Sequence, residues 1–380
     1  MTAADDPTTV GLAKAGAPDP LQERGALARA KAAILGGPDP GPQRIGRFEV
    51  IEAVGSGGMG VVYRARDPQL QRDVAIKVIR TTMQASKAQA ESARARMLRE
   101  AQALAALPHP NIVAIHDLGT LESTPESSAP DIYIVMELIE GAPLSRWRED
   151  DTPSREEVIQ AFIQAGTGLA AAHSVGVVHR DFKPSNVLID AAGRVRVVDF
   201  GLAQVASEPA AQASGTRSSN DSSTSRATSD LTEPDVILGT PSYMAPEQLR
   251  GEACDALVDQ YAFCIALTQM LTGELPFGTG AKGRRARATF VDDAPGVRSL
   301  PPRLRKVVTR GLQPNPARRF RDMPQLLAAL QHSKRRRRHL ALAGATLVGL
   351  SGAAAWLRTD DCSEGAGRMA ALWSDDARAA

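Results

Sequence analysis

Aromatic residues and cysteines are both scarce in this chain of 380 residues. Phe, Trp and Tyr together make up 4% of it, so a core must rely on Leu, Val, Ile and Ala. The three cysteines, Cys254, Cys264 and Cys362, are too few and too scattered for a disulfide framework or a cysteine-ligated zinc site. That count fits a reduced, cytoplasmic domain.

The chain also lacks a strong net charge of either sign. Its formal net charge is +2 at pH 7, which is too small to indicate nucleic acid as a partner. The N-terminus has no basic segment followed by an apolar core, so a signal peptide is not expected. Residues 1–46 are rich in Ala, Pro, Gly and Asp without a sustained strand pattern, and we expect a flexible leader there.

From Arg47 onwards the pattern becomes that of a folded domain. Strand-like runs at 48–51, 60–65 and 73–79 precede a helical stretch at 88–107 and two further runs at 112–118 and 132–138. Beyond Gly141 helical patterns dominate, notably at 155–174, 255–272 and 302–312. Strands followed by helices predict an α+β fold of two lobes, one a small antiparallel sheet with one helix and the other mainly helical, with a cleft between them.

Five motifs follow one another in a fixed order along residues 47–330. They are a glycine-rich loop at 54–62, Lys77 in a strand, His-Arg-Asp-Phe-Lys-Pro-Ser-Asn at 179–186, Asp-Phe-Gly at 199–201 and Ala-Pro-Glu at 245–247. A glycine cluster or an Asp-Phe-Gly alone is usually only a turn, but the ordered set is highly specific. The chain resembles a bacterial serine/threonine protein kinase of the eukaryotic (Hanks) type over this range.

The resemblance implies an ATP site in the cleft. Glycines in the loop would let backbone N–H groups approach the phosphates, and Lys77 would bind the α- and β-phosphates. Glu100 is the expected carboxylate partner of Lys77. Glu91 is the alternative, but it lies farther from the Pro-His-Pro-Asn-Ile-Val sequence at 108–113 than the spacing in the family allows. The nucleotide-binding set implied in this way is Val54, Gly55, Ser56, Gly57, Gly58, Met59, Gly60, Val62, Ala75, Lys77, Glu100, Met136, Glu137 and Leu138.

The resemblance also assigns the chemistry. Asp181 would be the catalytic base, and Asn186 and Asp199 would hold magnesium, or manganese in its place. Lys183 followed by Pro184 is the variant that accompanies serine and threonine substrates. Phe182 stands where the family usually has leucine, and as an apolar residue it should pack similarly. The implied catalytic set is Asp181, Lys183, Lys77, Asn186 and Asp199.

Other polar residues near the motifs are expected to be structural. His173 is predicted to pack at a helix end, and His179 to pack against Phe200 without proton chemistry. The resemblance further implies that Asp259 anchors the catalytic loop. It also implies a structural ion pair between Glu247 and Arg319, with Arg318 as the less favoured partner.

The segment between Asp-Phe-Gly and Ala-Pro-Glu is unusually long and rich in hydroxyl groups. Residues 207–233 contain almost no large apolar side chains, so this insert cannot order itself by burial. We expect an autophosphorylated switch, with Thr232 the first choice of site. The resemblance implies that Arg180, which precedes the catalytic aspartate, receives the phosphate. Thr240 is expected instead to contact Asp181 and Lys183. The alternative is a solvated insert whose phosphorylation changes nothing.

Residues 340–357 form a run of 18 uncharged residues that follows a basic segment at 331–339, which includes the five cations Lys334–Arg338. As a helix this run would be about 27 Å long, enough to cross a hydrocarbon core. A buried core helix is the alternative. The positive-inside rule places the kinase-like region in the cytoplasm, the span in the inner membrane and residues 358–380 outside.

Two other functions are weighed against a kinase. A pseudokinase scaffold would be expected to lose Lys77, Asp181 or Asp199, and none is lost. A small-molecule kinase would lack Ala-Pro-Glu and the preceding 239–243 run. The expected partners are protein substrates with serine or threonine acceptors, the chain itself and the lipid bilayer. The sequence leaves the oligomeric state open, a dimer included.

Overall fold

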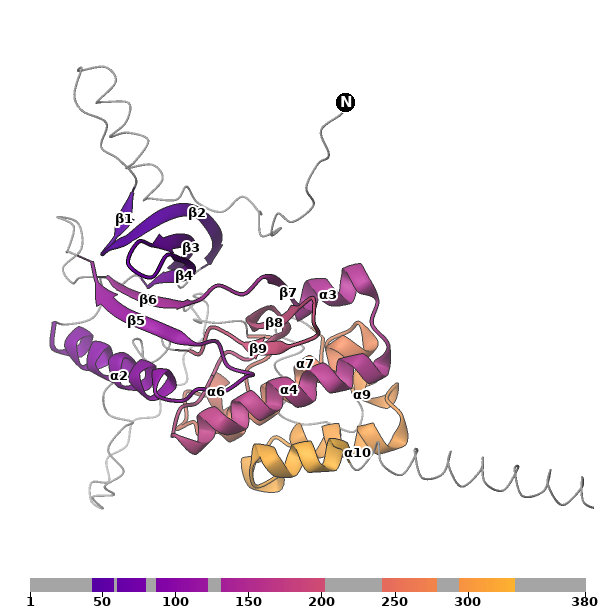
Figure 1. Cartoon of the computed structure of the whole chain (residues 1–380). Helices are drawn as coiled ribbons and strands as arrows, with labels where there is room; N and C mark the ends of the chain where they lie inside the picture. The colour runs from indigo at the N-terminus through magenta and orange to yellow at the C-terminus, as the bar shows by residue number, and fades with distance from the viewer. Residues whose placement is uncertain are drawn as a thin grey trace, which may run out of the picture. The chain divides into compact units, whose positions relative to one another are not determined.

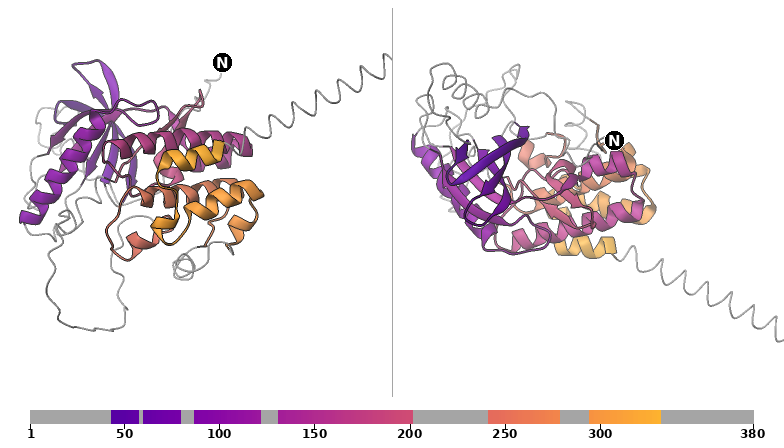
Figure 2. Two further views of the ribbon diagram at one scale, coloured as in Figure 1. Left: turned by 90° about the horizontal axis from the view of Figure 1, so that it is seen from below. Right: turned by 45° about the horizontal axis from the view of Figure 1, so that its top comes forward.

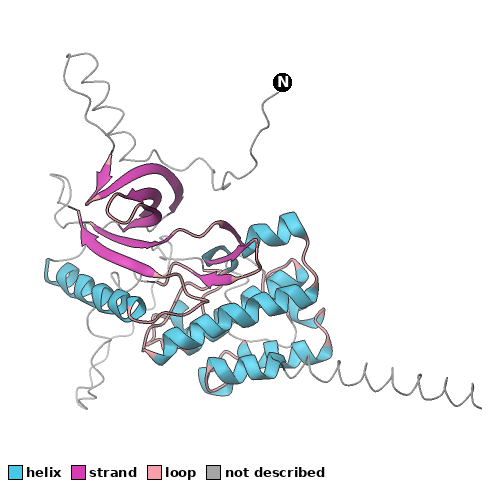
Figure 3. Cartoon of the chain, in the orientation of Figure 1, coloured by secondary structure: helices cyan, strands magenta, loops and turns pink. Residues whose placement is uncertain are grey.

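The computed structural model describes residues 43–57, 60–79, 87–121, 131–201, 241–278 and 294–331. Contacts divide the chain into two units, Met1–Leu327 and Ala328–Ala380. All five motifs belong to the first unit. Within that unit the strands and the helices are segregated, as Figure 3 shows by colour.

The N-terminal lobe is built on a six-stranded antiparallel sheet (Figure 1). Tyr63 and Ala65 alternate with outward residues along β3 and bury one face of the sheet against Ile45 and Phe48. In spatial order the strands are β1 (Arg44–Ile45), β2 (Phe48–Gly57), β3 (Gly60–Asp67), β4 (Arg72–Ile79), β6 (Ile132–Glu137) and β5 (Ile115–Thr120). The predicted antiparallel sheet is confirmed.

One helix, α2 (Lys87–Ala105), packs beside β5 in this lobe (Figure 1). Its buried residues Met97, Ala101 and Leu104 recur at helical spacing and so form one face. The helix ends just before Pro108, which cannot continue it.

The C-terminal lobe is mainly helical. Its two longest described helices, α4 (Arg155–Ser174) and α7 (Leu257–Thr272), pack together within the helical lobe that Figure 2 shows from two further sides. The rings of Phe162 and Phe263 meet edge to face at 5.2 Å between these helices. A capping box at Ser154 and Glu157 starts α4. The remaining elements are β7 (Gly141–Pro143), α3 (Leu144–Asp151), η1 (Pro184–Asn186), β8 (Val187–Asp190), β9 (Val195–Val197), α6 (Pro246–Leu249), α9 (Pro295–Arg298), α10 (Pro302–Gly311), η3 (Pro316–Arg318) and a helix at 323–331.

The stretch predicted as a strand at 112–118 divides between the lobes. β5 begins only at Ile115, whereas Ile112 forms a parallel bridge with Val197 of β9. The Asn111 side chain also donates a hydrogen bond of 2.8 Å to the carbonyl of Val195. Residues 111–113 therefore link the sheet of the first lobe to the strands that carry Asp-Phe-Gly.

Residues 1–42 of the predicted leader, most of the hydroxyl-rich segment and the predicted span at 340–357 lie outside the described residues. The predicted boundary of the leader at residue 46 is wrong, because Arg44–Ile45 form β1, which pairs with β2 and buries Ile45. Among the helices that the structure describes, none is long and apolar enough to cross a bilayer.

A buried ion pair ties the Ala-Pro-Glu segment to the end of the helical lobe. The Arg319 guanidinium donates two hydrogen bonds to the Glu247 carboxylate, at 2.6 and 2.8 Å, and a third to the carbonyl of Leu257 at 2.9 Å. Arg319 is the predicted partner and is almost fully buried, whereas Arg318 is exposed.

Replacing Arg319 with Met should therefore leave the buried Glu247 carboxylate without its ion-pair partner and lower the free energy of unfolding by about 3–5 kcal/mol. The double variant Glu247→Met/Arg319→Met should recover part of that loss, because no buried charge remains. Urea denaturation followed by fluorescence measures both. Arg318→Met is the matched control and should change the stability by less than about 0.5 kcal/mol. Equal losses in the single and double variants would contradict this account.

Candidate active site

The catalytic-loop motif, residues 179–186, is anchored at its start by one buried carboxylate. Asp259 on α7 accepts hydrogen bonds of 2.7 Å from the backbone N–H groups of His179 and Arg180. It also contacts His173 Nε2 at 2.7 Å. Burial alone would raise the pKa of Asp259, but the hydrogen bonds from His173 and the His179 amide hold that pKa below its usual value. The predicted anchoring role of Asp259 is confirmed in the geometry.

His179 is enclosed in the core, as expected. Its ring lies 4.8 Å from that of Phe200, and its Nδ1 accepts a hydrogen bond from the N–H of Asp181 at 3.3 Å. Nε2 must then carry the proton that bonds to the carbonyl of Val198 at 3.0 Å. Burial lowers the pKa of His179, so a neutral ring with this tautomer suits the site. The ring positions the loop and is not placed to transfer protons.

Asp181, Lys183 and Asn186 converge at the start of η1. Lys183 Nζ lies 2.7 Å from Asp181 Oδ2, and Asn186 Nδ2 donates to the carbonyl of Asp181 at 2.9 Å and to Oδ2 at 3.2 Å. Phe182 points the other way into the core, fully buried between Phe162 and Phe263. This apolar anchor holds the loop beside Asp181, whose carboxylate contacts Lys183 and Asn186.

Asp199 follows β9 and has an unusual backbone. Its φ of 58° is left-handed, as is the φ of 64° at Arg180. Next to it, a Cβ on Gly201 would lie 2.5 Å from the carbonyl of His179, so only glycine fits there. The N–H of Val198 also bonds to the carbonyl of Asn186 at 3.0 Å. The Asp-Phe-Gly segment is thus fastened against the catalytic loop.

The ion pairs of Lys77 and Glu100 differ from the expected arrangement. Lys77 Nζ lies 2.8 Å from Asp199 Oδ1, while Glu100 Oε1 lies 3.8 Å from Arg180 Nη2. No ion pair joins Lys77 to Glu100, both of which are described. The predicted Lys77–Glu100 pair is therefore not formed in this structure. The physical reason is that the Lys77 ammonium group is already paired with the Asp199 carboxylate. Glu100, on α2, is instead directed toward Arg180 of the catalytic loop.

The strands bring the expected nucleotide-binding residues onto neighbouring positions. In the register, Val62 pairs with Lys77, Ala75 with Met136 and Val54 precedes Gly55, which pairs with Val62. Gly60 has φ of 146°, and a Cβ there would lie 1.9 Å from the carbonyl of Val78. β2 includes Ser56 and Gly57, while Gly58 and Met59 lie outside the described residues.

Beyond the cleft strands, Glu137 ends β6 and pairs with Arg196 of β9 at 3.3 Å, and Leu138 follows it half-buried. This link ties the segment that joins the lobes to the strand leading into Asp-Phe-Gly.

The comparison with protein families decides the identity of this arrangement. The protein kinase domain matches residues 48–333. This chain belongs to the protein kinase family. Among its relatives, the serine/threonine-protein kinase PknB of Mycolicibacterium smegmatis is 36% identical over 76% of this chain and 43% of that protein. The DNA damage-responsive serine/threonine-protein kinase RqkA of Deinococcus radiodurans is 36% identical over 77% of this chain and 40% of that protein.

The chain spans about two fifths of the length of the curated relatives that it matches, since the shared part covers 41% and 43% of the first two. Among solved structures, the kinase domain of Mycobacterium tuberculosis PknI is 24% identical with a TM-score of 0.52, over 76% of this chain and 96% of that chain. That likeness supports the fold of the kinase domain.

The kinase domain offers oxygen donors suited to a divalent cation. Asn186 and Asp199 stand on segments joined by a backbone hydrogen bond, and the Asn186 amide nitrogen is committed to Asp181, which leaves its amide oxygen as the donor. The Asp199 side chain is 32% exposed and uses one oxygen on Lys77. Two oxygen donors fit magnesium, which takes few protein ligands and shares substrate phosphates.

Some residues that position this site were not predicted from the sequence. Gln248 donates to the carbonyl of Arg180 at 3.0 Å and accepts from the N–H of Ala245 at 2.9 Å. His173 proves to be a partner of Asp259 rather than a packing residue alone. The only signal for Gln248 is its position directly after Ala-Pro-Glu, and for His173 its place at the end of the helix that precedes the loop.

The lowered pKa of His179 predicts a pH dependence of stability. As pH falls below about 6.5, the unfolded chain takes up a proton that the buried ring excludes, so the free energy of unfolding should fall. His179→Phe removes this titration and should flatten the slope between pH 6.5 and 5, while lowering stability at pH 7 through the lost hydrogen bonds. Urea titrations at several pH values measure it, and an unchanged slope would contradict the assignment.

Proposed function

We propose that this chain transfers the γ-phosphoryl group of ATP to serine and threonine hydroxyls of proteins, itself included, in transmembrane signalling. The observation that carries this is the meeting of Asp181, Lys183 and Asn186 in one anchored loop, beside the segment where Asp199 contacts Lys77. Positioning and electrostatic stabilisation are the main demands of phosphoryl transfer, and these side chains supply both.

Each residue has a role that follows from its place. Asp181 accepts the proton of the attacking hydroxyl, and Lys183, 2.7 Å from that carboxylate, stabilises the negative charge of the transferred group. Lys77 binds the non-transferred phosphates. Asn186 and Asp199 would hold magnesium, which would supply neutralisation of the charge on the phosphates.

In this proposal, nucleotide binding exchanges ion-pair partners. Asp199 would leave Lys77 for the cation, and Lys77 would turn to the phosphates and to Glu100. Glu100 meanwhile contacts Arg180, the residue expected to bind a phosphate on the hydroxyl-rich segment between Asp-Phe-Gly and Ala-Pro-Glu. A phosphate carries nearly two charges and accepts strong hydrogen bonds from a guanidinium, so it would outcompete one carboxylate. Autophosphorylation at Thr232 would then release Glu100.

Membrane anchoring is the second part of the proposal. It is supported by the 18 uncharged residues at 340–357 and by the cations at 334–338 before them. The kinase domain would then work at the cytoplasmic face of the inner membrane.

The catalytic assignment predicts that Asp181→Asn and Lys77→Met lower the rate of phosphotransfer by about three orders of magnitude, because each removes a charge used in the transition state. The assay is transfer from labelled ATP to a generic protein acceptor and to the chain itself, scored as phosphoserine and phosphothreonine. Asp150→Asn, an exposed carboxylate on α3, is the control and should keep the wild-type rate. A wild type without transfer would instead favour a pseudokinase, and an active Asp181→Asn protein would remove Asp181 from the mechanism.

The anchoring proposal predicts that a reporter fused after Ala380 is active only outside the cytoplasm. The measurement compares a reporter that works outside with one that works inside the cell. Full-length protein that stays in the soluble fraction after gentle lysis would replace the span with a core helix.

A further inference from the structure

The surface around α10 carries an unusual excess of positive charge. Residues 294–331 contain eight lysines and arginines but one acid, Asp322. Arg319 is buried in its ion pair with Glu247, whereas the other seven lysines and arginines of this range are exposed. These exposed cations give the surface around α10 a positive charge that faces the solvent.

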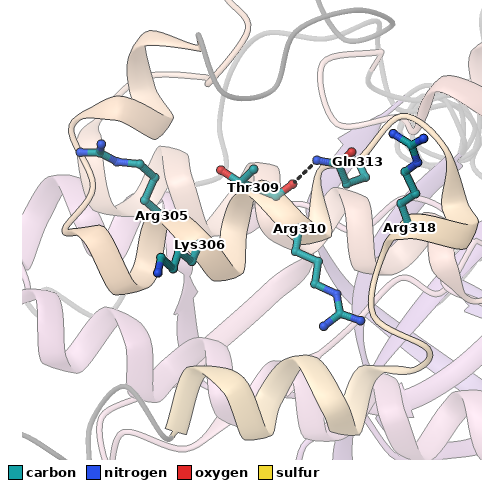
Figure 4. A pocket seen from close by; sticks show the side chains of 6 residues that line it. All are labelled: Arg305, Lys306, Thr309, Arg310, Gln313 and Arg318. Carbon is teal, nitrogen blue, oxygen red and sulfur yellow. Dashed lines mark hydrogen bonds between the residues drawn. The ribbon is translucent and has the colours of Figure 1, made fainter.

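Part of this surface is hollowed into a shallow groove of about 380 Å³ (Figure 4). Figure 4 shows Arg305 and Lys306 at one end of α10 and Arg318 of η3 near the other, with Thr309 and Gln313 between them. Arg303, Lys306 and Arg310 recur at helical spacing, so they extend the cationic lining along the helix. We define the α10 basic face as Arg303, Arg305, Lys306, Arg310 and Arg318.

The cations of this face fall into two kinds. Arg305 donates to the carbonyls of Arg298 and Leu300, and Arg310 stacks 4.3 Å over the ring of Phe320, so these two are fixed by the fold. Arg303, Lys306 and Arg318 have neither a side-chain hydrogen bond nor an ion pair among the described residues. None of the five cations has a carboxylate partner among the described residues, so their mutual repulsion is a cost to this surface that an anionic partner would relieve.

The chain itself points to the nature of that partner. Gln331 lies only nine residues before Leu340, the start of the proposed span, and a fully extended chain covers about 30 Å over that distance. The proposed anchor would therefore hold the domain close to the bilayer, where a short tether gives a high effective concentration. The cations at 334–338 continue the same sign of charge toward the membrane. Anionic lipid headgroups at the cytoplasmic surface attract such clusters.

We propose that the α10 basic face docks on the anionic headgroups of the cytoplasmic leaflet and so orients the kinase domain on the membrane. This inference rests on the proposed membrane anchoring. The contact is broad and electrostatic, so it weakens as salt is raised.

The test uses the full-length chain in vesicles. A donor fluorophore is attached to Gln313→Cys in a Cys254→Ser/Cys362→Ser background. Energy transfer to acceptor-labelled headgroups is then measured in neutral vesicles and in vesicles in which about 30% of the lipid is anionic. Transfer should be high with anionic lipid at about 0.1 M salt and fall to the neutral-vesicle value at about 1 M salt.

The variant Arg303→Gln/Lys306→Gln/Arg318→Gln removes three charges whose side chains make no described contact, so the fold should be kept. Each charge near an anionic surface is worth about fivefold, so the docked-to-undocked ratio should fall on the order of a hundredfold. The matched control also removes three exposed charges, whose ion pairs are superficial, and should dock like the wild type: Arg44→Gln/Arg146→Gln/Arg250→Gln.

The outcomes separate this inference from the anchoring proposal. Retention of the protein in neutral vesicles at high salt tests the span alone. If retention fails, anionic vesicles added to the free protein still test the face. Equal transfer in neutral and anionic vesicles would overturn the inference, as would equal losses in the two triple variants. Charge-dependent binding of a phosphoserine peptide without any lipid effect would also overturn it and make the groove a protein-docking site.

Discussion

The catalytic loop depends on a single buried carboxylate. Asp259 has no exposed surface, and a charge so placed is tolerated only when hydrogen bonds replace water. Its partners are two consecutive loop amides and His173. Hydrogen bonds to a charged group contribute about 1.5–3 kcal/mol each. The left-handed backbone of Arg180 costs about 1–3 kcal/mol. Two or three such bonds are enough to hold the loop in a shape that its sequence alone would not adopt.

From that fixed loop, order passes to the neighbouring segments. His179 bonds to the carbonyl of Val198, Val198 bonds to Asn186, and the N–H of Gly201 bonds to the carbonyl of His179 at 2.8 Å. The left-handed conformation of Asp199 lies between these two fixed points, Val198 and Gly201. The positions of Asn186 and Asp199 are therefore fixed largely by hydrogen bonds of the backbone, which do not depend on the conformation of long, flexible side chains.

The five motifs made the fold and most of the site predictable from the sequence. Their spacing is dictated by backbone constraints, such as the glycine required at Gly201 and the apolar anchor at Phe182, and such constraints leave a readable pattern. The partner of Glu100 was not predictable in this way. A side chain on a helix can reach either Lys77 or Arg180, and the choice depends on where the whole helix sits. The contact of His173 with Asp259 was missed for a related reason, since its position at the end of a helix does not identify a partner 86 residues away.

The burial of each ion pair matches the role proposed for it. Arg319 and Glu247 are 0% and 5% exposed and joined by two hydrogen bonds, so separating them would cost several kcal/mol. Lys77 and Asp199 are 12% and 32% exposed, and Arg180 and Glu100 are 15% and 21% exposed at the longer distance of 3.8 Å. Water and competing ions reach these two pairs, which reduces the free energy that each contributes. The proposed function needs this difference, since it keeps the Ala-Pro-Glu segment fixed while Lys77 and Glu100 change partners. The pair in the core is fixed, and the pairs in the cleft can be exchanged at low cost.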